Sequence, residues 1–141
     1  MKTKNIISEL NVKYDKYVII LKRGTFCEVY EEDCFVINYL FNYKISDYYG
    51  IKKVGFPISI LEKVTRELKK RNINYVFFEN EKILDSKKFR NNNYICFFDK
   101  SKKTIEINLE LERVKLLLMN NLNNDLNFDS LLAQLKLIDE R

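Results

Sequence analysis

Residues 22–30, KRGTFCEVY, hold one of only three glycines in a chain of 141 residues. The apolar, β-branched run 17–21, YVIIL, comes just before them and is typical of a buried strand. Gly24 permits a sharp turn after that strand, because glycine adopts backbone conformations that other residues resist. Residues 26–30 then predict a second strand, so the two segments are expected to form a corner with the glycine at its tip.

Alternation along the second strand decides which side chains share a face. Phe26, Glu28 and Tyr30 are expected on one face, and Cys27 and Val29 on the other. The sequence therefore predicts an aromatic ring beside a carboxylate, next to a glycine where backbone can approach a partner closely.

Two cations, Lys22 and Arg23, directly precede this corner. A ring that can stack, a carboxylate that can accept a hydrogen bond from a base and flanking cations together suggest contact with a nucleic acid. The alternative is structural: a Phe at a strand end is commonly a core residue, and an exposed Glu is commonly only solvated.

The corner resembles the mismatch-recognition domain (N-terminal domain, domain I) of MutS proteins, whose signature is a Gly-x-Phe-x-Glu turn. Gly24, Phe26 and Glu28 match that signature as they stand. The acidic helix entry and a small Gly-x-Pro element match as well, at Glu32, Asp33, Gly55, Phe56 and Pro57. The resemblance covers residues 12–80. It departs from the family at Thr25, where Asp is usual, and at Cys27, where Tyr is usual, and neither clamp nor ATPase regions are present.

The resemblance implies roles for these residues. Phe26 would enter a duplex from the minor groove and stack on a mispaired base, and Glu28 would accept a hydrogen bond from that base. The implied partner is double-stranded DNA that is mismatched or distorted, bound without cofactor or metal. The candidate phosphate contacts are Lys22, Arg23, Lys52 and Lys53, with Lys87, Lys88 and Arg90 as outlying candidates.

Charge is distributed unevenly along the chain, whose net charge is +5. Residues 1–103 carry 21 basic and 13 acidic side chains, and residues 104–141 carry 4 and 7. A basic body with a mildly acidic tail fits a polyanionic partner on the body. AT-rich coding, which enriches Lys, Asn, Ile, Tyr and Phe together, explains the same charge without any nucleic-acid partner.

Cysteine usage and the apolar runs bear on location. Three cysteines without a Cys-x-x-Cys pair indicate reduced thiols and a cytoplasmic protein. The basic start is not followed by the apolar region of a signal peptide, and the apolar runs are too short to cross a bilayer.

Periodicity and turn signals predict an α/β fold, a mixed sheet flanked by helices and similar to MutS domain I, with a C-terminal helical hairpin. Ser59 and Glu62 have the spacing of a capping box, and Asn72 is a helix stop.

The domains expected are a DNA-binding body, 1–110, and a helical extension, 111–141. The expected elements are helix 1–16, strands 16–22 and 26–30, a helix from 31–33 to 41, a strand near 43–46, helix 59–72, strand 73–79, a connector 80–92 with a helical turn near 81–84, a hairpin of strands 94–99 and 104–109, a helix from 111 and a last helix from 127 or 129.

Several kinds of catalysis are excluded by composition. Without histidine there is no Ser-His-Asp or Cys-His catalysis and no His-bearing zinc site, and three scattered glycines make neither a Walker A loop nor a Rossmann fingerprint. Cys27 has no base to activate it. We therefore expect a binding protein and not an enzyme.

Two alternatives stay open beside DNA binding. In the first, Phe26 is buried and the chain is a protein-interaction module whose partner, a second copy or a larger protein, binds residues 111–141. In the second, an acidic group ligates Mg²⁺ for phosphodiester cleavage, although acids are also common at a helix N-terminus. That group consists of Glu28, Glu31, Glu32 and Asp33.

Overall fold

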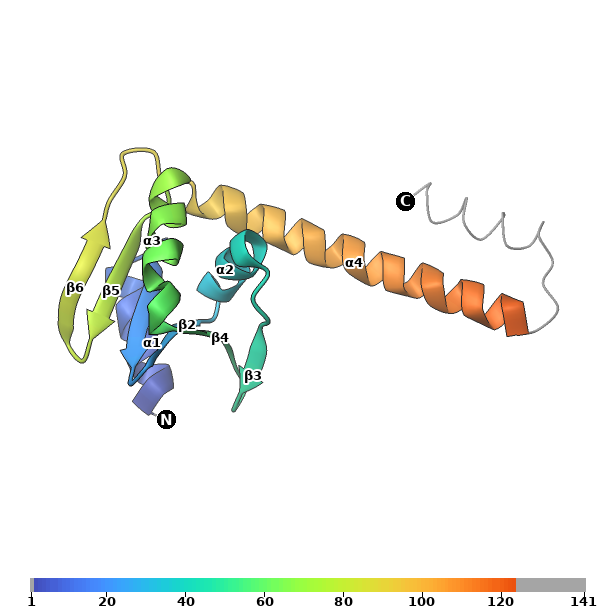
Figure 1. The fold of residues 1–141 in the computed structure, drawn as a ribbon, viewed down its shortest axis with the longest axis horizontal. Coiled ribbons are helices and arrows are strands. Elements are labelled where there is room, and N and C mark those ends of the chain that lie inside the picture. Colours follow the sequence, from blue (N-terminus) through green and yellow to red (C-terminus); the bar gives the residue numbers. More distant parts are fainter. Residues whose placement is uncertain (1, 124–141) are drawn as a thin grey trace. The chain divides into compact units, whose positions relative to one another are not determined.

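The structure, a computed structural model, describes residues 2–123 and contains a six-stranded mixed sheet with helices on both faces (Figure 1). The predicted α/β class is confirmed. The elements are α1 (Lys2–Lys13), β1 (Val18–Arg23), β2 (Phe26–Tyr30), α2 (Asp33–Phe41), β3 (Ser46–Tyr48), β4 (Ile51–Pro57), the 3₁₀ turn η1 (Ile58–Ile60), α3 (Leu61–Lys70), β5 (Tyr75–Glu79), β6 (Lys82–Lys87) and α4 (Tyr94–Asn123).

The strand order across the sheet is β3-β4-β2-β1-β5-β6. β1 and β5 run parallel, and each of the other neighbouring pairs runs antiparallel. A parallel pair needs a crossover connection, and here the chain between β1 and β5 supplies it with α2 and α3. β1 is therefore central, with the β2 hairpin on one side and the parallel β5 on the other.

The β1–β2 hairpin forms as predicted. Arg23 pairs with Phe26, so Gly24 and Thr25 make a two-residue turn. Gly24 has φ +65°, the left-handed conformation that a tight hairpin requires at its first central position. The alternation is also as predicted, since Cys27 and Val29 are fully buried on the opposite face from Phe26.

The two faces of the sheet bury separate apolar clusters. The larger cluster packs α2, α3 and the start of α4 against one face and includes Val29, Phe56 and Tyr75. The smaller cluster packs α1 against the other face and includes Ile7 and Leu21. Burial of both faces explains why the central strands β1 and β5 are apolar almost throughout.

Asp33 joins three elements at the edge of this core. Its buried carboxylate accepts hydrogen bonds from the Ile19 amide of β1, at 3.0 Å, and from the Tyr94 hydroxyl of α4, at 2.5 Å. Burial raises the pKa of the Asp33 carboxyl to about 7, against the lowering effect of those two hydrogen bonds. The carboxyl also lines a polar pocket of about 390 Å³, together with Lys16 and Glu31.

The predicted hairpin over 94–109 is wrong, because these residues belong to the single helix α4. Tyr94, Phe97 and Ser101 are buried at spacings of three and four residues, which is the period of a helix. No glycine or proline follows Pro57, so the sequence offers no strong breaker for this helix. The sequence also predicts a break at the Asn-rich stretch 120–127, but α4 continues through residues 120–123. The rest of that stretch and the expected last helix lie outside the described residues.

Three smaller expectations are also wrong. Residues 82–87 form the edge strand β6, all of whose residues are exposed, so that no alternation marks it in the sequence. The strand expected at 43–46 begins only at Ser46. It pairs with β4, a strand that the sequence analysis did not predict. Ser59 does not cap α3, because it lies within the 3₁₀ turn η1. That turn is joined to the β1–β2 hairpin, since the Ile58 amide donates a hydrogen bond to the Thr25 carbonyl at 2.9 Å. The stop at Asn72 is confirmed by its φ of +57°.

Contacts divide the chain into two units, Met1–Lys102 and Lys103–Arg141. The functional division expected between residues 110 and 111 stays a prediction. Within residues 2–123, no helix has both the length and the apolar composition that crossing a bilayer requires.

Candidate nucleic-acid interface

Phe26 begins β2 directly after the glycine turn, and its residue surface is 51% exposed. Its neighbours in the sheet are Arg23 of β1 and Pro57 of β4, which lie directly opposite it in the two ladders. Side chains directly opposite in neighbouring strands lie on the same face. The ring is therefore placed at the surface with a cation on one side and a rigid proline on the other.

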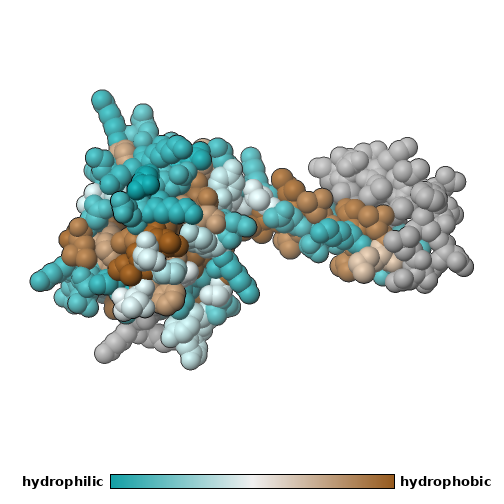
Figure 2. All heavy atoms as spheres, in the orientation of Figure 1, coloured by the Kyte–Doolittle hydropathy of each residue, from teal (hydrophilic) through white to brown (hydrophobic). Residues whose placement is uncertain are grey.

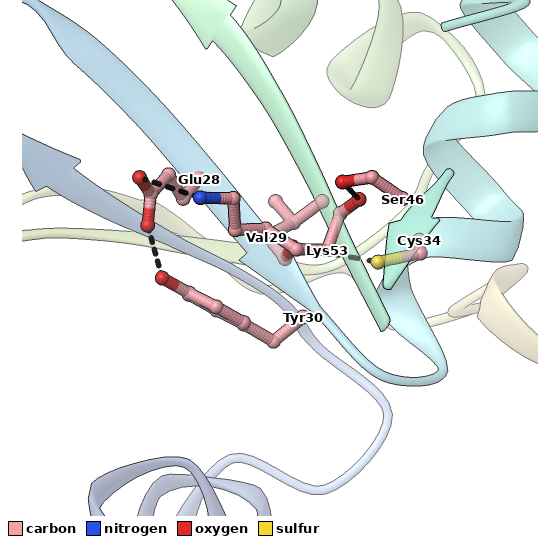
Figure 3. A network of polar contacts seen from close by, with 6 residues as sticks. All are labelled: Glu28, Val29, Tyr30, Cys34, Ser46 and Lys53. Carbon is pink, nitrogen blue, oxygen red and sulfur yellow. Dashed lines mark hydrogen bonds and ion pairs between the residues drawn. The ribbon is translucent and has the colours of Figure 1, made fainter. Parts of the chain in front are cut away.

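Glu28 lies on the same face but is mostly buried. Its side chain is only 16% exposed, and its Oε1 lies 3.4 Å from the Lys53 ammonium (Figure 3). The Tyr30 hydroxyl donates a hydrogen bond to the other carboxylate oxygen (Figure 3). Burial, then the bond to Glu28, raises the pKa of the Tyr30 hydroxyl, which stays protonated as the donor. The carboxylate is thus oriented by Tyr30 and neutralised by Lys53.

Gly55 lies directly opposite Glu28 in β4 and presents no side chain there. Its backbone is not in the left-handed region, and an added Cβ would meet only the Cys27 carbonyl oxygen, at 3.8 Å. Nothing in the backbone thus requires glycine at this position. Its effect is to leave the sheet surface uncovered beside the Glu28 carboxylate.

The predicted phosphate contacts divide between the two faces. Arg23 and Lys53 lie on the face of Phe26 and Glu28, as their pairing with Phe26 and Tyr30 requires. Lys22 is opposite the buried Cys27 and forms an ion pair with Glu79 at 2.7 Å.

Lys52 and the outlying cations also lie apart from the face that carries Phe26 and Glu28. The Lys52 ammonium lies 5.1 Å from the centroid of the Phe35 ring, on the other side of the sheet from Lys53. Lys87 ends the edge strand β6, and Lys88 and Arg90 follow it. The structure therefore brings together Arg23, Phe26, Glu28 and Lys53, and it separates the remaining candidates from them.

Aromatic residues of the β3–β4 turn were missed by the sequence analysis. Tyr48 and Tyr49 are both exposed, and their rings meet edge to face at 4.7 Å. The Lys53 ammonium also lies 4.7 Å from the centroid of the Tyr48 ring, so Tyr48 adjoins the Glu28–Lys53 pair. Two consecutive tyrosines before Gly50 were the available signal, but only the pairing of β3 with β4 places Tyr48 beside Lys53.

The acidic group does not converge on one point. Asp33 is turned inward, the Glu31 carboxylate accepts a hydrogen bond from the Lys52 amide, and Glu32 lies 3.7 Å from the Lys16 ammonium. Among the described residues, no three acidic or cysteine side chains are placed so that they could hold a metal ion. The geometry thus gives no support to the metal-dependent nuclease alternative.

A search of protein-family models finds none that matches this chain, and a search of curated proteins finds no match either. The resemblance to the MutS domain therefore depends on the residues of the glycine corner and on the order of the elements around it.

Proposed function

We propose that this chain is a DNA-binding module similar to the mismatch-recognition domain of MutS proteins, and that it binds mismatched or distorted duplex DNA. The observation that supports this most directly is the half-exposed Phe26 ring at the Gly24 corner, with Arg23 beside it. An apolar ring held at the surface by a tight turn is suited to wedge between base pairs. We further propose a cytoplasmic location, where the chain would take part in DNA mismatch repair.

Selection of a mismatch follows from the energy of insertion. Unstacking a base step costs a few kcal/mol, and less where pairing is already defective. Stacking a base on an aromatic ring returns about 1–3 kcal/mol. These two terms nearly cancel on a matched duplex and favour binding at a mismatch, so preference arises from deformability.

Glu28 would act through an exchange of partners. As DNA approaches, Lys53 leaves Glu28 for a phosphate, and the carboxylate accepts a hydrogen bond from the unstacked base. Tyr30 keeps the carboxylate oriented throughout, because its hydroxyl bonds the second oxygen. A carboxylate near phosphates is otherwise repelled, so its contribution depends on finding a donor on the base.

A module of this size makes few phosphate contacts, so its affinity would be weak and would fall steeply with salt. The test is electrophoretic mobility shift at low salt on matched and mismatched duplexes, with the wild type and Phe26→Ala. The matched control is Tyr49→Ala, which removes another exposed ring outside the group around Glu28. We expect mismatch preference in the wild type and in Tyr49→Ala, and its loss in Phe26→Ala. Equal binding of both duplexes by wild type and Phe26→Ala would overturn the proposal.

A protein-interaction module is the second candidate. It is favoured by the large apolar side chains exposed along residues 103–123 of α4. The form of this alternative in which Phe26 is a core residue is not supported, because the ring is half exposed. Binding of a protein partner without any shift of DNA would favour this candidate over the first.

A further inference from the structure

Residues 103–123 of α4 expose an unusual number of large apolar side chains. Five are more than half exposed, and Figure 2 shows apolar residues, in brown, recurring among polar ones along this part of the helix. They are Ile107, Leu109, Leu111, Leu116 and Met119. Exposed apolar side chains that gather on one element mark a surface for another protein.

Together with the partly exposed Ile105, Val114 and Leu118, these side chains form two stripes on opposite sides of the helix, given 3.6 residues per turn. The first stripe consists of Ile107, Leu111, Val114 and Leu118, spaced by four, three and four residues. The second consists of Ile105, Leu109, Leu116 and Met119. A helix that is apolar on two opposite sides needs a partner on each side.

A segment that runs once along the helix covers only one of two opposite stripes, so each stripe is matched to a partner by its own pattern of side chains.

We propose that a second copy of this chain covers the first stripe, with the two helices parallel and in register. The spacing of four, three and four residues is that of alternating d and a positions in a coiled coil, with Leu111 and Leu118 at a and Ile107 and Val114 at d. In that assignment Glu110 is a g residue and Lys115 the following e residue. These are the positions that form ion pairs between parallel helices, so Glu110 of each copy meets Lys115 of the other.

Charge distinguishes this arrangement from an antiparallel one. In antiparallel pairs g residues meet g residues and e residues meet e residues, which would leave Glu110 and Lys115 without opposite charges. Among residues 2–123, these two residues form exposed ion pairs with near neighbours on the same helix, Glu110 with Arg113 at 2.8 Å and Lys115 with Glu112 at 3.5 Å. Such pairs are weak and are readily exchanged for pairs between helices.

The mass of the full chain in solution tests the proposal. Sedimentation equilibrium is expected to give twice 17.0 kDa for the wild type. Leu111→Glu, on the first stripe, should give a monomer, while Leu109→Glu, on the second, should leave the mass unchanged. The two residues are 54% and 66% exposed, so the variants are matched in exposure and in chemistry. Circular dichroism confirms that each variant is folded.

Charge exchange tests the register. Glu110→Lys and Lys115→Glu should each weaken association by about tenfold, because each replaces two attractive pairs by repulsive ones. The double variant should restore it. Three results would each overturn the proposal. They are a monomeric wild type, dissociation of the dimer by Leu109→Glu but not by Leu111→Glu, and a double variant that associates no more tightly than the single variants.

A cysteine at position 111 tests the direction. Residues at the same a position face each other only in a parallel, in-register pair, where their Cα atoms come within disulfide reach. Leu111→Cys, in a chain that also carries Cys96→Ser, should therefore form a covalent dimer under oxidised glutathione. The Cys96 change removes an exposed thiol, whereas Cys27 and Cys34 are buried. Leu109→Cys in the same background should stay monomeric on a denaturing gel, and the reverse result would refute parallel pairing.

Discussion

Replacing Asp33 by asparagine should change how the stability of the protein depends on pH. The carboxyl is buried, and its pKa is raised to about 7 from an ordinary value of 3.8. The folded state therefore binds a proton that the unfolded state releases between pH 4 and 7. Because the folded pKa is the higher one, this contribution to stability is fully present below about pH 4 and is lost as pH rises through 7. The amide side chain of the Asp33→Asn variant does not titrate, so the variant would lack this loss.

The magnitude follows from the shift. A difference of about three pKa units corresponds to about 4 kcal/mol over the whole range, and to about 3 kcal/mol between pH 5 and 8. An asparagine still accepts from the Ile19 amide and can donate its own amide to the Tyr94 oxygen, so both connections of Asp33 can persist. We expect Asp33→Asn to gain about 3 kcal/mol relative to the wild type from pH 5 to pH 8.

Urea unfolding followed by circular dichroism at several pH values measures this difference, and it suits a chain without tryptophan. Asp99→Asn, at an exposed position, controls for the loss of one negative charge. Parallel stability curves for the wild type and Asp33→Asn between pH 5 and 8 would refute the reasoning. Such curves would mean that the hydrogen bonds from Ile19 and Tyr94 offset the cost of burying the charge.

Two further predictions concern the glycine corner. Gly24→Ala should lower the free energy of unfolding by about 1–2 kcal/mol, because its φ of +65° lies in the left-handed region, which is strained for alanine. Gly55→Ala should change it by less than about 0.5 kcal/mol, because the Gly55 backbone is not in that region. Thermal unfolding of the two variants measures both effects, and equal effects would contradict the assignment of the turn. Tyr30→Phe should lower the free energy of unfolding by about 1.5–3 kcal/mol, because it removes the donor to the Glu28 carboxylate. Tyr49→Phe, at an exposed position, should leave the free energy of unfolding almost unchanged. If urea unfolding shows no difference between these two variants, the bond to Glu28 does not stabilise the fold.

The extent to which the candidate site could be predicted depends on how local each feature is. The sequence placed Phe26 and Glu28 on one face, because alternation along five residues requires it. It could not show that the Glu28 carboxylate is held by Lys53, because that contact depends on the register of β2 with β4, 25 residues further along the chain. The grouping of Lys22 with Arg23 and of Lys52 with Lys53 was wrong for a local reason, because neighbours in a strand point to opposite faces.

Short-range chemistry by itself determined the β1–β2 hairpin, the buried strand β5 and the helix stop at Asn72, since glycine or asparagine at a turn and apolar runs act within a few residues. Tertiary structure alone decided the course of residues 94–109. The alternating apolar and polar residues at 104–109 suit a strand, yet they continue a helix whose first turns pack Tyr94 and Phe97 into the core. Packing of a few side chains on the core outweighs a local pattern, because burying a large aromatic side chain contributes about 1.5–3 kcal/mol and local propensities contribute tenths.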